Sequence, residues 1–112
     1  MPYLKINSNV LASTPKELVL HVSAAISKAL GKPESYVMVV YEHNTHMVFA
    51  GNDAPLAYLE LKSIGLPEAQ TKTLSDTLCT LINETLSVPT ERIYIEFANA
   101  QRHLWGWNKQ TF

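Results

Sequence analysis

The sequence predicts an α+β fold: a four-stranded mixed sheet with two helices on one face. Two observations support this prediction. The chain is written as two similar halves, about residues 1–55 and 56–112, and each half has the pattern strand, helix, strand. A helix that crosses between two strands of one sheet makes those strands parallel. With 112 residues, the chain has room for a single domain spanning residues 1–112.

The repeat is visible in two pairs of segments. Residues 3–8 align with residues 58–63, and both alternate apolar and polar side chains as half-buried strands do. Residues 32–39 align with residues 88–95, and in each a proline turn leads into a β-branched strand. Because the identities are few, a chance likeness between two strand–helix units is the alternative.

The first helix is predicted to begin at Pro15 and to end at Gly31. Thr14 is the expected N-cap, and Glu17 would complete a capping box with it. The apolar residues in between fall on one face at helical spacing, which indicates a helix packed on the sheet.

The second helix is predicted to start near Pro67 and to stop before Pro89. Cys79, the one cysteine of the chain, falls among the apolar residues of this helix. We therefore expect a buried free thiol rather than a nucleophile, and no disulfide within one chain.

The later strands of both halves look more apolar than one layer of helices would cover. The residues that suggest this are Tyr36, Met38, Val40, Ile93, Ile95 and Phe97. A symmetric oligomer that buries the second sheet face would explain them. Short extra strands are expected at residues 47–49 and 104–107.

Composition excludes several classes of function. The net charge is -1 and only two arginines occur, which argues against a nucleic-acid partner or a membrane-binding basic face. The N-terminus has no apolar signal segment, so we expect a cytoplasmic protein, or one secreted without a signal peptide. His43 and His46 share a loop, but no further metal ligands are indicated. We expect no metal and no cofactor.

Several short segments, taken together and in order, resemble one family. They are Met1-Pro2, Gly31-Lys32-Pro33 followed by Tyr36, residues 47–51, Ser63-Ile64-Gly65, residues 92–95, Gly106-Trp107-Asn108 and the ending Thr111-Phe112. In this order and spacing they are similar to the macrophage migration inhibitory factor family, from the first residue to the last.

The resemblance implies a homotrimer and a keto–enol tautomerase of the phenylpyruvate tautomerase or dopachrome isomerase type, acting on a small aromatic keto acid. It implies that Pro2 is the catalytic base once Met1 is removed. The substrate-binding residues that it implies are Lys32, Tyr36, Ser63, Ile64, Trp107 and Phe112, together with Tyr94 from the neighbouring subunit.

The chemistry fits these residue types. A terminal proline is a secondary amine, and an apolar pocket beside Lys32 would lower its pKa, so that the neutral base is present. Two of the departures from the family pattern concern the pocket. Glu96 replaces an asparagine at the pocket rim, where its carboxylate would repel an acidic substrate, and Trp105 replaces a smaller apolar residue.

Two other functions stay open on the sequence. One is a secreted signalling ligand that binds a protein receptor and retains only vestigial tautomerase activity. The other is a non-catalytic interaction module that only trimerises.

Overall fold

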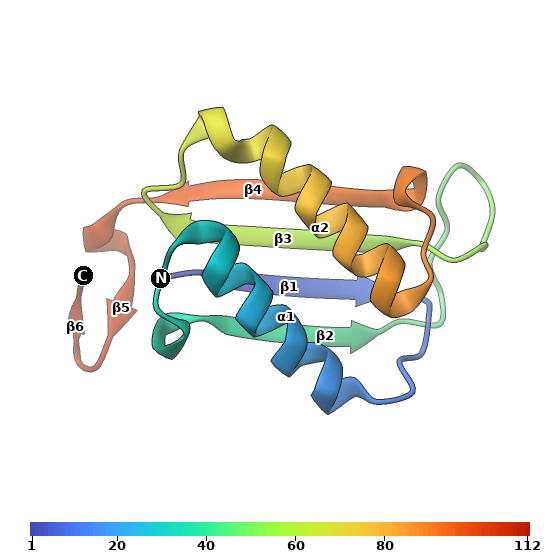
Figure 1. The fold of residues 1–112 in the computed structure, drawn as a ribbon, viewed down its shortest axis with the longest axis horizontal. Coiled ribbons are helices and arrows are strands. Elements are labelled where there is room, and N and C mark those ends of the chain that lie inside the picture. Colours follow the sequence, from blue (N-terminus) through green and yellow to red (C-terminus); the bar gives the residue numbers. More distant parts are fainter.

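In a computed structural model that describes residues 1–112, the chain forms a four-stranded sheet with two helices across one face (Figure 1). The elements are β1 (Tyr3–Ser8), α1 (Pro15–Leu30), β2 (Met38–His43), β3 (Ala57–Ile64), α2 (Thr71–Leu86), β4 (Ile93–Ala100), β5 (Gly106–Trp107) and β6 (Gln110–Thr111). Short 3-10 helices occupy Glu34–Tyr36, Glu68–Gln70, Thr90–Arg92 and Arg102–Leu104.

The sheet is mixed, and its strand order is β2-β1-β3-β4. The pairs β1–β2 and β3–β4 are parallel, whereas the central pair β1–β3 is antiparallel. Each half of the chain is therefore a strand–helix–strand unit, and the two units join through their first strands. This confirms the predicted fold class.

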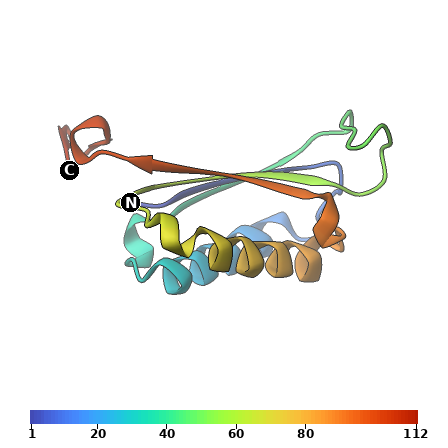
Figure 2. The ribbon, with the colours of Figure 1, turned by 90° about the horizontal axis from the view of Figure 1, so that it is seen from above.

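The core lies between the sheet and the helices, which Figure 2 shows on the same side of the strands. The central strands supply side chains that are completely buried, and they meet the apolar stripes of both helices. These residues are Leu4, Ile6, Leu59 and Leu61 from the strands, with Val22, Ile26, Leu78 and Ile82 from the helices. Burial of each such side chain contributes about 1.5–3 kcal/mol.

The helix ends differ in part from the prediction. Gly31 caps α1 in the left-handed conformation (φ 63°), as expected. Thr14 is the N-cap, but its side chain makes no capping hydrogen bond, so the predicted capping box is absent. Thr14 and Glu17 are both exposed, and water can satisfy the free N–H groups there. The second helix starts at Thr71, because Pro67 is extended and a 3-10 turn precedes α2.

The orientation of β4 contradicts one sequence interpretation. Ile93, Ile95 and Phe97 pack against the core on the helix side. Because side chains alternate along a strand, Tyr94 and Glu96 then point to the open face of the sheet. The apolar residues of β4 therefore do not indicate a second buried face.

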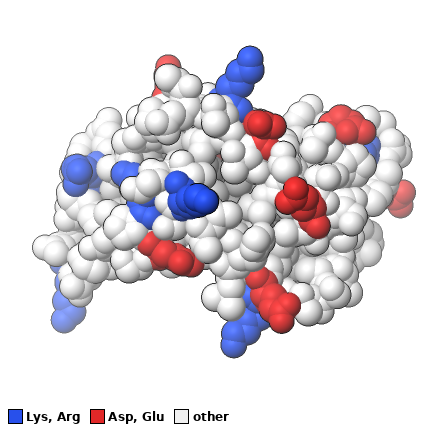
Figure 3. All heavy atoms as spheres, viewed as in Figure 1, with Lys and Arg blue, Asp and Glu red and all other residues white.

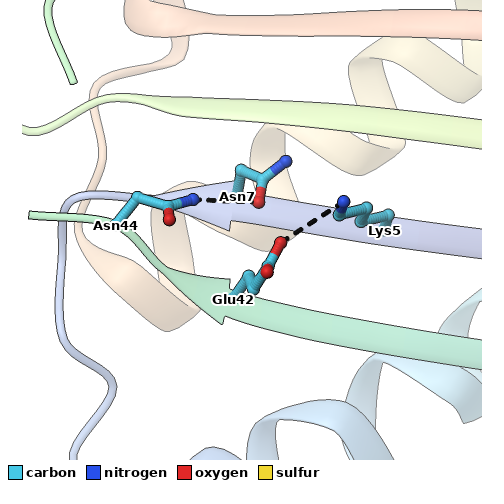
Figure 4. Close-up of polar contacts among 4 residues, drawn as sticks. All are labelled: Lys5, Asn7, Glu42 and Asn44. Carbon is cyan, nitrogen blue, oxygen red and sulfur yellow. Dashed lines mark hydrogen bonds and ion pairs between the residues drawn. The ribbon is translucent and has the colours of Figure 1, made fainter. Parts of the chain in front are cut away.

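The open face of the sheet is mixed rather than apolar. Met38 is exposed there, but the Nζ atom of Lys5 pairs with Oε2 of Glu42 at 3.3 Å. Beside this pair, the amide of Asn44 donates a hydrogen bond to Oδ1 of Asn7 at 3.1 Å (Figure 4). Such a face is suited to contact with water as much as with another chain.

The predicted extra strands are partly present. Gly106 and Trp107 form β5, which pairs with β6, whereas Leu104 ends a 3-10 turn. Residues 47–49 form no strand, and only a single bridge joins Phe49 to Asn52.

Cys79 is half-buried on α2 rather than fully buried. Burial raises the pKa of its thiol, which keeps it protonated at neutral pH. Separately, none of the helices has both the length and the apolar character needed to cross a bilayer.

Candidate active site

A cavity of about 350 Å³ lies at the end of the sheet where β1 starts. Both chain termini lie at this end (Figure 1). The cavity is lined by Met1, Pro2 and Tyr3 on one side and by the C-terminal segment on the other. Its size is within the range of sites that enclose a small organic molecule.

One wall of the cavity consists of aromatic rings. Trp107 and Phe112 are stacked, with centroids 5.4 Å apart and planes 16° apart. Tyr36 meets both rings edge to face, at 5.6 Å from Trp107 and 5.9 Å from Phe112. Trp105 also lines the cavity. Aromatic pairs in these geometries are mutually stabilising and would accept a further ring.

The C-terminal hairpin holds that wall in place. Asn108 and Lys109 both have positive φ (49° and 67°), as a two-residue type I′ turn between β5 and β6 requires. The backbone N–H of Phe112 donates to the carbonyl of Trp105 at 3.2 Å. This bond closes the segment so that Trp107 and Phe112 face Tyr36.

Pro2 is fixed at the opposite wall. Pro2 is buried, and its carbonyl accepts a hydrogen bond of 3.0 Å from the N–H of Met38. The terminal amine in the structure belongs to Met1. Burial lowers the pKa of that amine, and the positive charges of Lys32 and Arg102 lower it further.

Lys32 follows the end of α1 and does not line the cavity. Its backbone N–H donates to the carbonyl of Ser27 at 3.1 Å, and its Nζ donates to the carbonyl of Ile64 at 3.4 Å. Ser63 and Ile64 are both buried at the end of β3. The Oγ of Ser63 donates to the carbonyl of Ile64 at 3.5 Å. These three predicted residues therefore form a group beside the cavity.

Tyr94 and Glu96 lie away from the cavity within one chain. Tyr94 pairs in register with Tyr58, four residues along β3 from Lys62, which does line the cavity. Four residues of strand span about 13 Å. Tyr94 instead lines a second apolar cavity, where its ring centroid is 4.7 Å from that of Phe49.

Glu96 faces the open side of the sheet, opposite Glu60 in β4–β3 pairing. Glu96 affects Tyr58 on the neighbouring strand. Desolvation raises the pKa of the Tyr58 hydroxyl, and the negative charges of Glu96 and Glu60 raise it further. The structure of one chain therefore does not bring Glu96 to the cavity rim.

Lys62 is a cavity residue that the sequence reasoning missed. It stands opposite Tyr3 in the antiparallel β1–β3 pair, and its Nζ lies 5.9 Å from the centroid of the Tyr3 ring. In a strand that alternates apolar and polar residues, a lysine is expected at a solvent-exposed position. Only the antiparallel pairing of β1 with β3, which sets Tyr3 opposite Lys62, could have indicated it.

His43 is the last residue of β2 and so does not share a loop with His46. The Nε2 of His43 lies 3.2 Å from the carbonyl of Asn9. No three His, Cys, Asp or Glu side chains in the structure are grouped as a metal site would need.

Comparison with known proteins places this site in context. The sequence profile described as macrophage migration inhibitory factor matches residues 1–112. The protein named macrophage migration inhibitory factor from Meriones unguiculatus is 35% identical, over 100% of this chain and 99% of its own length.

Two solved structures are also similar. One is the homologue of that factor from Prochlorococcus marinus, with a TM-score of 0.93 and 38% identity over 98% of both chains. The other is the factor from Trichinella spiralis, with a TM-score of 0.92 and 32% identity over 98% of this chain and 99% of that one.

Proposed function

This chain belongs to the macrophage migration inhibitory factor family, and from that premise we propose that it is a keto–enol tautomerase. Its general base is the nitrogen of Pro2, freed by removal of Met1. Its substrates are small aromatic 2-keto acids such as phenylpyruvate, or dopachrome-like compounds. The observation that carries the proposal is the place of the N-terminus in an aromatic-walled cavity, where burial and the charges of Lys32 and Arg102 lower the pKa of the Met1 amine.

The depressed amine pKa supports a role as base. A general base works best when it is neutral at the operating pH and still able to accept a proton. Without Met1, the amine of Pro2 would stand next to the same cavity and the same cations, Lys32 and Arg102. Its ring stays oriented because the Pro2 carbonyl is bound by Met38.

The reaction that we propose moves one proton. The nitrogen of Pro2 removes a proton from the carbon next to the keto group, and the C–H electron pair forms the C=C bond of an enolate. The enolate oxygen takes a proton from water to yield the enol, and the protonated Pro2 nitrogen returns its proton to water, so that the net change moves one proton from carbon to oxygen. Lys32 and Arg102 favour the negative charge that develops on oxygen. The aromatic wall holds the ring of the substrate.

We propose that the protein assembles as a homotrimer. Tyr94 is 65% exposed and borders an apolar cavity at the end of the sheet remote from Pro2. Contact with a neighbouring subunit would cover this cavity and bring Tyr94 to the neighbour's site. Sedimentation equilibrium at micromolar concentration should show a trimer. A monomer at that concentration would contradict the assembly and the role of Tyr94.

The decisive experiment changes the chemistry of the Pro2 nitrogen and leaves its ring in place. Intact mass first establishes that Met1 is absent from the purified protein. Insertion of alanine between Met1 and Pro2 then turns the proline nitrogen into an amide, which has no basicity. We expect this variant to lose phenylpyruvate tautomerisation. The ultraviolet absorbance of the enol measures the reaction. Pro2→Gly is less informative because the Pro2 residue is buried.

A matched control separates chemistry from folding. The insertion variant should keep the helical circular dichroism and the sedimentation behaviour of the unmodified protein. Lys16→Ala, at an exposed position of α1 outside the cavity, keeps the free proline and should stay active. Full activity in a folded insertion variant would show that Pro2 is not the base.

A further inference from the structure

The lining of the cavity is electrostatically one-sided. Lys62 is the one lysine or arginine among the lining residues, and no aspartate or glutamate is among them. On the helix-covered face, which is the one that Figure 3 shows, basic side chains gather in the half that holds both termini, with more acidic ones in the other half. An anion in the cavity would meet a cation and no carboxylate in the wall.

The charge of Lys62 is free to bind a ligand. The structure has one ion pair, between Lys5 and Glu42, so Lys62 makes none. Glu60 and Glu96 lie on the same open face, two residues away along the strands, but neither is within ion-pair distance of it. The ammonium lies instead 5.9 Å from the centroid of the Tyr3 ring.

The position of Lys62 follows from strand pairing. Lys62 and Tyr3 are directly opposite each other, so their side chains share the open face of the sheet. Tyr3 follows Pro2, and all three residues line the cavity. A ligand whose ring rests on the aromatic wall and whose reacting carbon faces Pro2 would therefore present its polar end between β1 and β3.

We propose that Lys62 binds the carboxylate of the substrate and makes the cavity selective for aromatic 2-keto acids over their neutral counterparts. This inference rests on the proposed function and adds a binding residue to it. Lys62 thereby differs from Lys32, whose ammonium is held by the carbonyl of Ile64 beside the cavity. Lys62 binds the carboxylate, whereas Lys32 acts from beside the cavity on the base and on the substrate oxygen that gains charge.

Equilibrium binding tests the inference without relying on turnover. The ligands are 3-phenylpropionate and its methyl ester, which carry the ring with and without the charge, and the signal is tryptophan fluorescence from the cavity wall. Lys62→Met should weaken binding of the acid about three- to tenfold, between the effect of an exposed ion pair and that of a charged hydrogen bond. Binding of the ester should change by less than about twofold.

Two further variants complete the set. Lys62→Arg keeps the charge and should bind the acid within about twofold of the unmodified protein. Lys5→Met removes the same charge from the same face of the sheet, outside the cavity, and should leave binding of the acid unchanged. Added salt should weaken acid binding by the unmodified protein more than by Lys62→Met.

Kinetics provides a second measurement. In Lys62→Met the KM for phenylpyruvate should rise by the same factor, with kcat and the pH profile unchanged. Equal losses for acid and ester, or an equal loss in Lys5→Met, would overturn the role of Lys62. If the unmodified protein bound the acid through Lys62 but had no tautomerase activity, the proposed function would fail and the binding role would stand. Lys62→Gln serves if the methionine variant does not fold.

Discussion

Arg92 is expected to hold the loop between β2 and β3 against the start of β4. Its guanidinium donates four hydrogen bonds to backbone carbonyls, at 3.0–3.2 Å. The acceptors are Phe49, Asn52, Ala54 and Pro55. The guanidinium also lies 5.3 Å from the centroid of the Phe49 ring. One side chain therefore fastens a loop that has no strand pairing beyond a single bridge.

The expected cost of Arg92→Met follows from these contacts. Most of the four bonds are exposed, so water can replace the lost donor and each bond counts at the low end, about 0.5 kcal/mol. Loss of the ring contact adds about 0.5 kcal/mol. We expect the free energy of unfolding to fall by about 2.5 kcal/mol. Arg92→Lys should recover less than half, because an ammonium cannot reproduce the planar fork.

Urea unfolding at one fixed protein concentration measures the loss, since assembly makes stability depend on concentration. Hydrogen exchange should show faster exchange at the amides of Phe49 and Asn52, which bond to each other across the loop. Arg102→Met is the matched control, because the Arg102 side chain is exposed and should cost less than about 0.5 kcal/mol. A loss below about 0.5 kcal/mol in Arg92→Met, with unchanged loop exchange, would refute this reasoning.

Three further predictions concern the site, a helix end and the core. Lys32→Met should raise the pKa seen in the pH profile of kcat/KM, because the protonated amine loses a repelling cation; the rise of activity then moves to higher pH. An unmoved profile would show that Lys32 does not act on the amine. Thr14→Ala should change the free energy of unfolding by less than about 0.5 kcal/mol, since Thr14 makes no side-chain capping bond; a loss near 1 kcal/mol would indicate a cap in solution. Leu59→Ala, at a completely buried position, should cost about 2–5 kcal/mol in urea unfolding, and a smaller loss would mean that the core relaxes around the cavity.

Local sequence signals predicted the elements well where they agreed with one another. Alternation places β1 at Tyr3–Ser8, as observed, and Pro15 with Gly31 marks both ends of α1. The orientation of β4 could not be read in the same way. A strand with apolar residues at every second position states that one face is buried, but not whether helices or another subunit cover it. Ile93, Ile95 and Phe97 pack on the helix side of the sheet, which leaves Tyr94 on the open side.

The candidate site was predicted through family resemblance more than through local signals. Tyr36 lies far in the sequence from Trp107 and Phe112, and only the folded chain brings its ring to theirs. Lys62 escaped because its role depends on strand register, a long-range property. The distance of Tyr94 from the cavity also follows from register, since Tyr94 pairs with Tyr58 rather than with Lys62.

The meeting of both termini at one cavity restricts how the protein can be handled. A purification tag at the N-terminus would turn the Pro2 nitrogen into an amide. A tag after Phe112 would extend from the residue whose ring forms part of the cavity wall. Neither end can carry a fusion partner without disturbing the cavity. The first turn of α1 lies at the far end of the sheet (Figure 1), and Lys16 is exposed there. A dye or surface linkage placed at that lysine would leave the cavity, and whatever enters it, undisturbed.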